Sequence, residues 1–272
     1  MDRDTLLAAG DRNLADVLRL AARHAPDGAS DDDGQLLLVS LSRTWPGPYT
    51  NGALRLDHSL SAAEVLVRAE SFFAGRCPGY CIWIAAHADA DLEETALAAN
   101  LVQISPSGSP RMALDHPLAM AEPAGGVALH EVVDESGRRD YLAVTLASYD
   151  KALMPQDVAE AQLATVESLA GPTVHAVVAR ADGRPVAAAM VVLSGDVAGI
   201  QLVGTVPDAR GRGLGELCTR WAANAGFASG AGAVVLEASD MGEPLYRRMG
   251  FVEVSRYRWC FGPPPVSRSE AR

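Results

Sequence analysis

Residues 210–215 read Arg-Gly-Arg-Gly-Leu-Gly, a combination suited to binding an anion. An extended apolar run at 200–206 precedes them, and apolar residues at helical spacing follow. Glycines let the backbone approach an anion closely, and the first N–H groups of a helix point toward it. We therefore predict a phosphate site in which residues 211–216 donate N–H groups, with Arg210 and Arg212 as guanidinium partners.

The glycine spacing argues against two common nucleotide sites. A dinucleotide fingerprint needs Gly-x-Gly-x-x-Gly, whereas position 216 here is Glu216. A P-loop needs Gly-Lys-Ser/Thr, and the one lysine of the chain is Lys151. A Rossmann dehydrogenase is accordingly a disfavoured alternative.

A second segment with chemical potential stands about thirty residues further on, where residues 244–251 read Pro-Leu-Tyr-Arg-Arg-Met-Gly-Phe. Its tyrosine, Tyr246, can donate a proton or a hydrogen bond to a leaving group. Complete transfer from a free phenol to a thiolate is uphill by roughly 2 kcal/mol, because the two pKa values are about 10 and 8.5. We therefore expect Tyr246 to act mainly as a hydrogen-bond donor whose proton moves late.

Together the two segments resemble the signatures of the GCN5-related N-acetyltransferases (GNATs). Arg210, Gly213 and Gly215 fit the family's Gln/Arg-x-x-Gly-x-Gly/Ala motif, and residues 245–251 fit Leu-Tyr-x-x-x-Gly-Phe. The resemblance covers roughly residues 127–261. The first half is similar to the catalytically silent N-terminal domains of tandem GNAT proteins.

The resemblance implies an α/β fold with a mixed, mostly antiparallel sheet, a splayed central parallel pair and flanking helices, in two tandem copies. It implies an acyltransferase that moves an acetyl group from acetyl-CoA to a primary amine by direct attack on the thioester. Tyr246 would be the general acid, and no metal would be needed. The residues implied to bind the cofactor are Val203, Gly204, Thr205, Arg210, Gly211, Arg212, Gly213, Leu214, Gly215, Glu216 and Ser239.

Ser239 marks a departure, because many family members carry Asn at this place. The base that accepts the amine's proton is left open among Glu237, Asp240 and Glu131. The scattered histidines have no ligand spacing and receive no role. A catalytically silent acyl-CoA sensor is the alternative function, and it would show binding without turnover.

The order of the predicted elements divides the chain into a degenerate GNAT-like domain at 1–118, a linker at 119–126, a catalytic domain at 127–262 and a disordered tail at 263–272. Asp31, Asp32 and Asp33 are expected in a solvated loop. The predicted helices span 14–25, 62–73, 91–100, 141–149, 155–169 and 242–249, besides the one that begins at 214. The predicted strands span 35–41, 53–56, 80–86, 127–133, 174–178, 186–193, 200–206, 233–236 and 251–260, with short extended pieces up to 115.

The composition limits the classes of partner. A net charge of −11 argues against a nucleic-acid binder, and no apolar run is long enough to cross a membrane. The N-terminus lacks a signal-peptide pattern, so a cytoplasmic location is expected. The four cysteines form neither a disulfide framework nor a zinc motif. The expected partner is an amine on a small molecule or a protein, and a homodimer is the default assembly.

Overall fold

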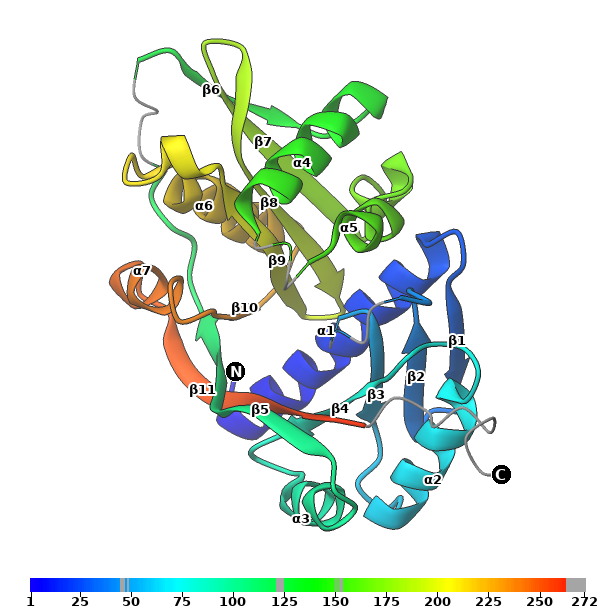
Figure 1. Cartoon of the computed structure of the whole chain (residues 1–272). Coiled ribbons are helices and arrows are strands. Elements are labelled where there is room, and N and C mark those ends of the chain that lie inside the picture. Colours follow the sequence, from blue (N-terminus) through cyan, green and yellow to red (C-terminus); the bar gives the residue numbers. More distant parts are fainter. Residues whose placement is uncertain (45–46, 48, 121–124, 150, 152–153, 263–272) are drawn as a thin grey trace.

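The chain folds around one large mixed sheet. The structure is a computed structural model that describes residues 1–44, 47, 49–120, 125–149, 151 and 154–262. Its strands form an eleven-stranded sheet in the order β1-β2-β3-β4-β11-β5-β10-β9-β8-β7-β6 (Figure 1). Helices cover the sheet, which confirms the predicted fold class.

The elements of the first half alternate between strands and helices. The chain begins with the long helix α1, which Asp2 caps through its carboxylate. Its elements are α1 (Arg3–His24), β1 (Ala29–Asp32), β2 (Leu36–Ser40), β3 (Asn51–Arg55), α2 (Ala62–Phe73), β4 (Cys81–Ala85), α3 (Ala90–Ala98) and β5 (Val102–Leu114).

The second half repeats this alternation with a longer antiparallel meander. It contains β6 (Val127–Glu131), α4 (Glu135–Ser148), α5 (Gln156–Gln162), the 3-10 turn η1 (Val166–Ser168), β7 (Val174–Ala181), β8 (Arg184–Ser194), β9 (Val197–Thr205), the 3-10 turn η2 (Pro207–Ala209), α6 (Leu214–Ala228), β10 (Ala233–Glu237), α7 (Glu243–Arg248) and β11 (Val252–Phe261).

The two halves interlock at the centre of the sheet. The last strand, β11, lies between β4 and β5 of the first half and pairs antiparallel with both. In turn β5 pairs antiparallel with β10 of the second half. The described pairings contain two parallel pairs, β3–β4 and β9–β10. Strands from either side of the predicted linker thus alternate in the middle of the sheet.

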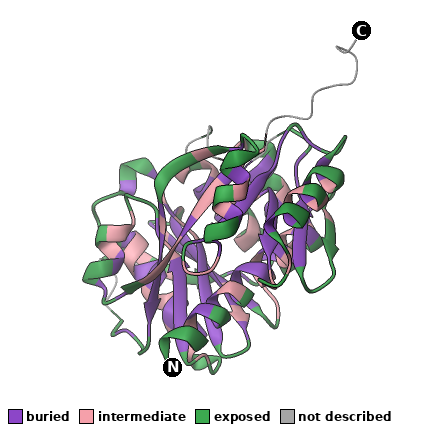
Figure 2. Ribbon diagram, turned by 90° about the horizontal axis from the view of Figure 1, so that it is seen from below, coloured by how far each residue is buried: buried purple, intermediate pink, exposed green. Residues whose placement is uncertain are grey.

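The helices shield the strands from solvent. Figure 2 shows buried strands lined by helices whose outer surfaces are exposed. In Figure 1, α1 runs diagonally between the two groups of strands. It is attached to the second half by Asn13, whose side-chain amide donates to the carbonyl of Val192 in β8 at 2.8 Å. The first half's own helix therefore helps to cover the meander of the second half.

Several predicted boundaries are wrong. The helix expected at 155–169 is interrupted, because Thr165 adopts an extended conformation (φ −128°, ψ 161°) between α5 and η1. Asp31 and Asp32 belong to the edge strand β1, whose side chains are mostly exposed, and only Asp33 and Gly34 lie in the loop. The short pieces expected before Asp115 are one strand, β5. The strand expected at 251–260 is β11, and its register against β5 shifts between Glu253 and Ser255.

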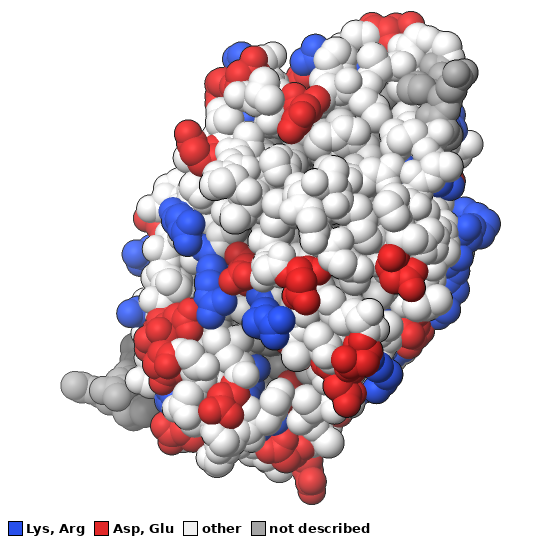
Figure 3. Space-filling view, turned by 180° about the vertical axis from the view of Figure 1, so that it is seen from behind, with Lys and Arg blue, Asp and Glu red and all other residues white. Residues whose placement is uncertain are grey.

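Two predicted segments fall outside the described residues. These are the tail at 263–272 and the part of the linker at 121–124. The division into a silent and a catalytic domain stays a prediction. None of the helices in the described part of the chain has the length and apolar character of a membrane span. On the face shown in Figure 3, positive and negative side chains alternate in small groups rather than forming one broad basic surface.

Candidate active site

The glycine turn forms an open cradle at the start of α6. Gly211 and Gly213 both have a φ of +75°, a conformation that side chains with a Cβ rarely adopt. No described atom lies within 4 Å of where a Cβ would stand on either residue. Gly213 is the N-cap residue of α6, and no side chain caps the helix there. The first N–H groups of α6 are therefore free for an anion.

Gly215 brings the helix against the preceding strand. A Cβ on this residue would lie 3.0 Å from the hydroxyl oxygen of Thr205, the last residue of β9. Thr219, one turn further along α6, donates its hydroxyl to the carbonyl of Gly215 at 2.8 Å. The helix start and the end of β9 consequently form one surface.

The strands β9 and β10 part from each other before they reach the turn. Their parallel pairing covers only Val197–Gly199 and Ala233–Val235. Beyond it, Leu202 has a φ of +47°, and the register between β8 and β9 shifts at the same place. The splay between β9 and its parallel neighbour is the arrangement that the sequence resemblance implies.

The hydrogen bonds between β8 and β9 after the register shift show which backbone groups of β9 face the space between β9 and β10. Val206 donates its N–H to the carbonyl of Val186 on β8. Because backbone groups alternate along an antiparallel strand, the N–H and C=O of Thr205 point away from β8 and toward the splay. Thr205 thus directs its backbone N–H and C=O toward the edge where an extended ligand would pair.

Two side chains already bind carbonyls along this edge. Tyr149, at the end of α4, donates its hydroxyl to the carbonyl of Val203 at 3.1 Å. Arg210 donates from Nε to the carbonyl of Thr205 at 3.2 Å and from Nη2 to that of Ser148 at 2.9 Å. These two bonds use two of the five N–H donors of the Arg210 guanidinium, so other donors remain for a phosphate.

A buried hydroxyl without a partner lies on the same edge. Within the described part of the chain, Ser148 Oγ accepts and donates no hydrogen bond although it is buried. A Cβ on Gly204 would lie 2.9 Å from this oxygen. Gly204 therefore leaves room for the hydroxyl, and the hydroxyl is a polar group that a bound ligand or water can satisfy.

Tyr246 lies where the turn and the splay meet. Its hydroxyl hydrogen-bonds with Thr219, which links it to Gly215 through the threonine's own bond. The tyrosine is 8% exposed, and its ring packs edge-on against Phe251 with centroids 5.9 Å apart. Burial raises the pKa of Tyr246 to about 12, although the Thr219 bond lowers it. The phenol therefore stays neutral, and able to donate, at physiological pH.

The other predicted cofactor residues have local roles. Ser239 is exposed, and its hydroxyl accepts from the N–H of Gly242 at 3.2 Å, at the start of α7. Glu216 forms an ion pair with Arg220 at 2.7 Å. Arg212 is exposed and bonds to none of the described residues, while Leu214 is buried in the core. The structure thus gathers the turn, Thr205 and Tyr246, and leaves Ser239 at the margin.

The three carboxylates considered as bases lie in different surroundings. Glu237 is bound by the buried Arg111, whose Nε and Nη2 lie 2.8 and 2.6 Å from Glu237 Oε1. Glu131 lies beside His175 in a groove of about 410 Å³ that also includes Ala228, the last residue of α6 and thus far from the turn. Asp240 is exposed, and among the described residues it is the one of the three that no arginine or histidine side chain contacts.

Sequence reasoning missed Tyr149, Ser148 and Thr219. Thr219 left a local signal, since a threonine four residues after a helical glycine can bond back to its carbonyl. Tyr149 left only an apolar helix end, because its partner Val203 is 54 residues away.

Residues 172–253 match a family model described as an acetyltransferase (GNAT) domain. The chain contains a GNAT domain. The match includes the glycine turn and Tyr246, whereas the first half lies outside it. No curated protein matches the sequence significantly.

Solved GNAT structures share the fold of the whole chain. A GCN5-related N-acetyltransferase from Kribbella flavida has 22% identity and a TM-score of 0.69, over 93% of this chain and 95% of that one. A GCN5-related N-acetyltransferase from Sphaerobacter thermophilus has 16% identity and a TM-score of 0.60, over 86% and 82%. A tandem GNAT protein from the clavulanic acid biosynthesis pathway has 12% identity and a TM-score of 0.58, over 96% and 95%. These likenesses include the first half, and at such identities they concern the fold.

Proposed function

We propose that the protein is an acetyl-CoA-dependent N-acetyltransferase that acts on a primary amine by direct attack on the thioester. One observation carries the proposal. An uncapped helix start with two open glycines, a strand parted from its neighbour and a buried neutral phenol meet at one place. An anion site alone would not need the phenol.

The turn fits the diphosphate of acetyl-CoA. Gly211 and Gly213 leave space for it, and α6 offers the uncapped N–H groups and the partial positive charge of its N-terminus. Arg212 bonds to none of the described residues and can pair with phosphate, and Arg210 can do so with the donors that the carbonyls of Thr205 and Ser148 do not use. Acetyl-CoA supplies the activated acetyl group.

The parted strand fits the amide-bearing arm of the cofactor. Thr205 offers backbone groups toward the splay, and Ser148 Oγ offers an unsatisfied hydroxyl beside it. A backbone N–H held rigidly at this edge can also stabilise the charge that grows on a carbonyl oxygen during acyl transfer.

Tyr246 acts as a hydrogen-bond donor to the departing sulfur. With a pKa of about 12 against about 8.5 for a thiol, full transfer of its proton would be uphill by roughly 5 kcal/mol. This is more than an unperturbed phenol would require. We therefore assign Tyr246 the stabilisation of developing thiolate charge, with the proton moving late.

Thiol release from acetyl-CoA with a panel of amines tests the activity. We expect turnover with at least one amine and a fall of about a hundredfold in kcat for Tyr246→Phe, with little change in acetyl-CoA affinity. Tyr80→Phe, which removes the hydroxyl of another buried tyrosine, is the matched control and should retain kcat. Tight acetyl-CoA binding without thiol release on any amine would instead indicate a sensor. Unchanged kcat for Tyr246→Phe would remove this residue from the mechanism.

A further inference from the structure

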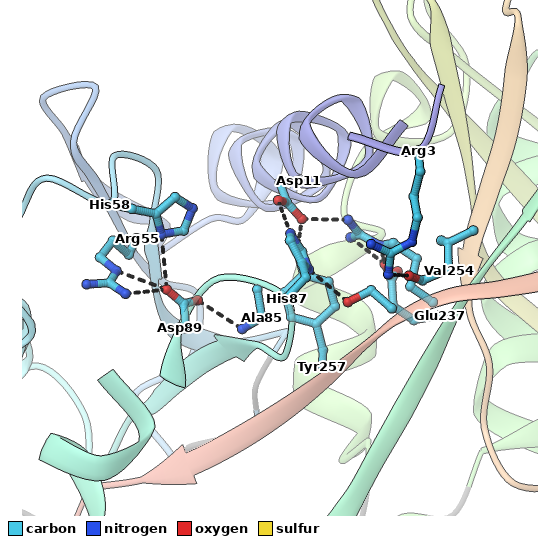
Figure 4. A network of polar contacts seen from close by, with 12 residues as sticks. Arg3, Asp11, Arg55, His58, Ala85, His87, Asp89, Glu237, Val254 and Tyr257 are labelled. Carbon is cyan, nitrogen blue, oxygen red and sulfur yellow. Dashed lines mark hydrogen bonds and ion pairs between the residues drawn. The ribbon is translucent and has the colours of Figure 1, made fainter. Parts of the chain in front are cut away.

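A serine, a histidine and an aspartate form a hydrogen-bonded relay away from the glycine turn. Asp11 comes from α1, His87 follows β4, and Ser255 stands on β11, so the relay lies where the two halves interlock. The oxygen Asp11 Oδ2 lies 2.9 Å from His87 Nε2, and Ser255 Oγ lies 2.8 Å from His87 Nδ1. Figure 4 shows Asp11 and His87 directed toward each other.

The partners of Asp11 decide where the histidine proton resides. Asp11 Oδ1 accepts from Arg111 Nη1 at 2.8 Å and from the hydroxyl of Tyr257. Burial alone would raise the pKa of Asp11, but the His87 hydrogen bond and the Arg111 charge outweigh it and lower that pKa. A charged Asp11 accepts, so neutral His87 carries its proton on Nε2. Its Nδ1 is then the acceptor for the Ser255 hydroxyl, as a general base must be.

The pattern equals that of a serine nucleophile with its base and orienting acid, with the two ring nitrogens exchanged. The exchange does not alter the chemistry, because the ring nitrogen that faces the serine still accepts the hydroxyl proton and returns it. The histidine side chain is 14% exposed, so it is held in place and yet reaches solvent.

A groove of about 390 Å³ opens onto the relay and is lined by His87 and Ser255. Its charged lining residues are Arg3, Glu253 and Arg256, of which Glu253 and Arg256 form an ion pair with each other at 2.7 Å. Arg3 donates a hydrogen bond from Nη2 to the carbonyl of Val254 at 3.0 Å, and its other guanidinium N–H groups remain available to a ligand in the groove. The groove is thus sized for a short acyl chain and carries a cation.

The register shift in β11 lies beside the groove. Val254 has no partner in the ladder between β11 and β5, because the pairing passes from Glu253 to Ser255. Such bulges leave a backbone N–H unpaired and are frequent beside active sites. Arg3 is a donor on the groove wall that can stabilise an oxyanion formed next to Ser255.

We propose that Ser255 is the nucleophile of an esterase site, separate from the acetyltransferase site, for short acyl esters that carry an anionic group. Ser255 Oγ attacks the ester carbonyl and forms an acyl–oxygen bond, while His87 takes the hydroxyl proton. The bond to the leaving alkoxide breaks, and His87 returns the proton to it. Water, activated by His87 in the same way, then hydrolyses the acyl-serine to a carboxylic acid and restores the hydroxyl.

Labelling with a fluorophosphonate and peptide mapping by mass spectrometry test the nucleophile. We expect one adduct on Ser255 in the full-length protein and a loss of labelling rate of at least a hundredfold in His87→Gln. His116→Gln is the matched control, since His116 also bonds an aspartate, at 2.8 Å, but has no serine partner. No adduct on Ser255, or equal labelling of His87→Gln and wild type, would overturn the proposal.

Hydrolysis of 4-acetoxybenzoate and phenyl acetate tests the substrate class. Ser255→Ala should abolish the hydrolysis of both esters while acetyl-CoA-dependent transfer continues. Tyr246→Phe should slow acetyl transfer and leave the hydrolysis of both esters unchanged. Arg3→Gln should raise KM about tenfold for the anionic ester and leave that for phenyl acetate unchanged. Equal KM changes for the two esters would contradict the role of Arg3, and hydrolysis retained in Ser255→Ala would refute the site.

Discussion

The two halves share a local strand–helix–strand arrangement but differ in how its helix begins. Each contains a parallel strand pair, β3–β4 or β9–β10, and each has a helix, α2 or α6, in the connection between the paired strands. The difference lies at the helix start. Ser61 caps α2 by accepting from the N–H of Glu64 at 3.3 Å, whereas Gly213 begins α6 without a side-chain cap.

That difference separates a structural turn from an anion site. In α2 the Ser61 hydroxyl binds one of the N-terminal donors. Both helices carry a glutamate in the first turn, Glu64 in α2 and Glu216 in α6, but Glu216 is ion-paired with Arg220. The helix α6 leaves its donors free above two glycines. We propose that the residues at the cap make the first half the silent half and the second half the binding half.

The largest effect is expected where the halves are joined rather than where they differ. Glu237→Gln removes the charge that pairs with the fully buried Arg111. The free energy of unfolding should fall by about 3 kcal/mol, at the lower end for a broken buried pair because Asp11 still holds Arg111. Urea unfolding measures it. The control is Glu253→Gln, which removes the charge of a partly exposed ion pair. An equally small loss of unfolding free energy in both variants would show that the Arg111–Glu237 pair does not hold the two halves together.

A carboxylate in the cradle should make the binding half resemble the silent one. Gly213→Asp imposes a side chain at positive φ and places a negative charge where a diphosphate would bind. We expect the Kd for acetyl-CoA, measured by calorimetry, to rise at least about a hundredfold. Gly183→Asp, at φ +81° in an open hairpin turn, carries the same backbone cost without the site. Comparable loss of affinity in both variants would contradict the cradle.

The pH profile of acetyl transfer tests the role of Tyr246, which lies beside the glycine turn of the second half. Tyr246 is active when protonated, so a pKa raised to about 12 keeps it active to higher pH, and its contribution is lost as the pH rises through that value. The rate of acetyl transfer should rise as the amine loses its proton and show no decline up to pH about 10.5, whereas an exposed tyrosine would titrate near 10. A decline centred near pH 10 that Tyr246→Phe abolishes would contradict the burial effect.

The smallest effect is expected at the cap of the silent half. Ser61→Ala should lower the free energy of unfolding by about 1 kcal/mol, because an N–H of α2 loses its partner. The affinity for acetyl-CoA should not change. Ser71→Ala, an exposed position within α2, is the control for helix propensity. Altered acetyl-CoA affinity in Ser61→Ala would place a ligand at α2 and remove the contrast between the halves.

Local features of the site were predictable because neighbouring residues encode them. The positive φ values at Gly211 and Gly213, and the helix that begins at Leu214, follow from glycine spacing and apolar periodicity. The splay and Tyr246 near the turn came from the family resemblance, since the strand pattern alone does not show which neighbours part.

Long-range features were not predictable from one sequence. The pairing of Arg111 with Glu237 joins residues 126 positions apart, and no local pattern sets it. The same holds for Tyr149, which looks like any aromatic helix end until Val203 lies beside it. The edge strand β1 was missed because its exposed aspartates lack the alternation that a half-buried strand shows.

The place of β11 has a consequence for the order in which the protein acquires its shape on the ribosome. In the first half β4 and β5 are joined by β11, which is translated after all the other strands of this sheet, so β4 and β5 emerge without the strand that lies between them. The edges of β4 and β5 that pair with β11 stay unpaired until about 140 residues beyond β5 have left the exit tunnel. Nascent chains that stop short of Val252 should therefore expose two strand edges, and chaperones that protect such edges should bind them until the final strand arrives.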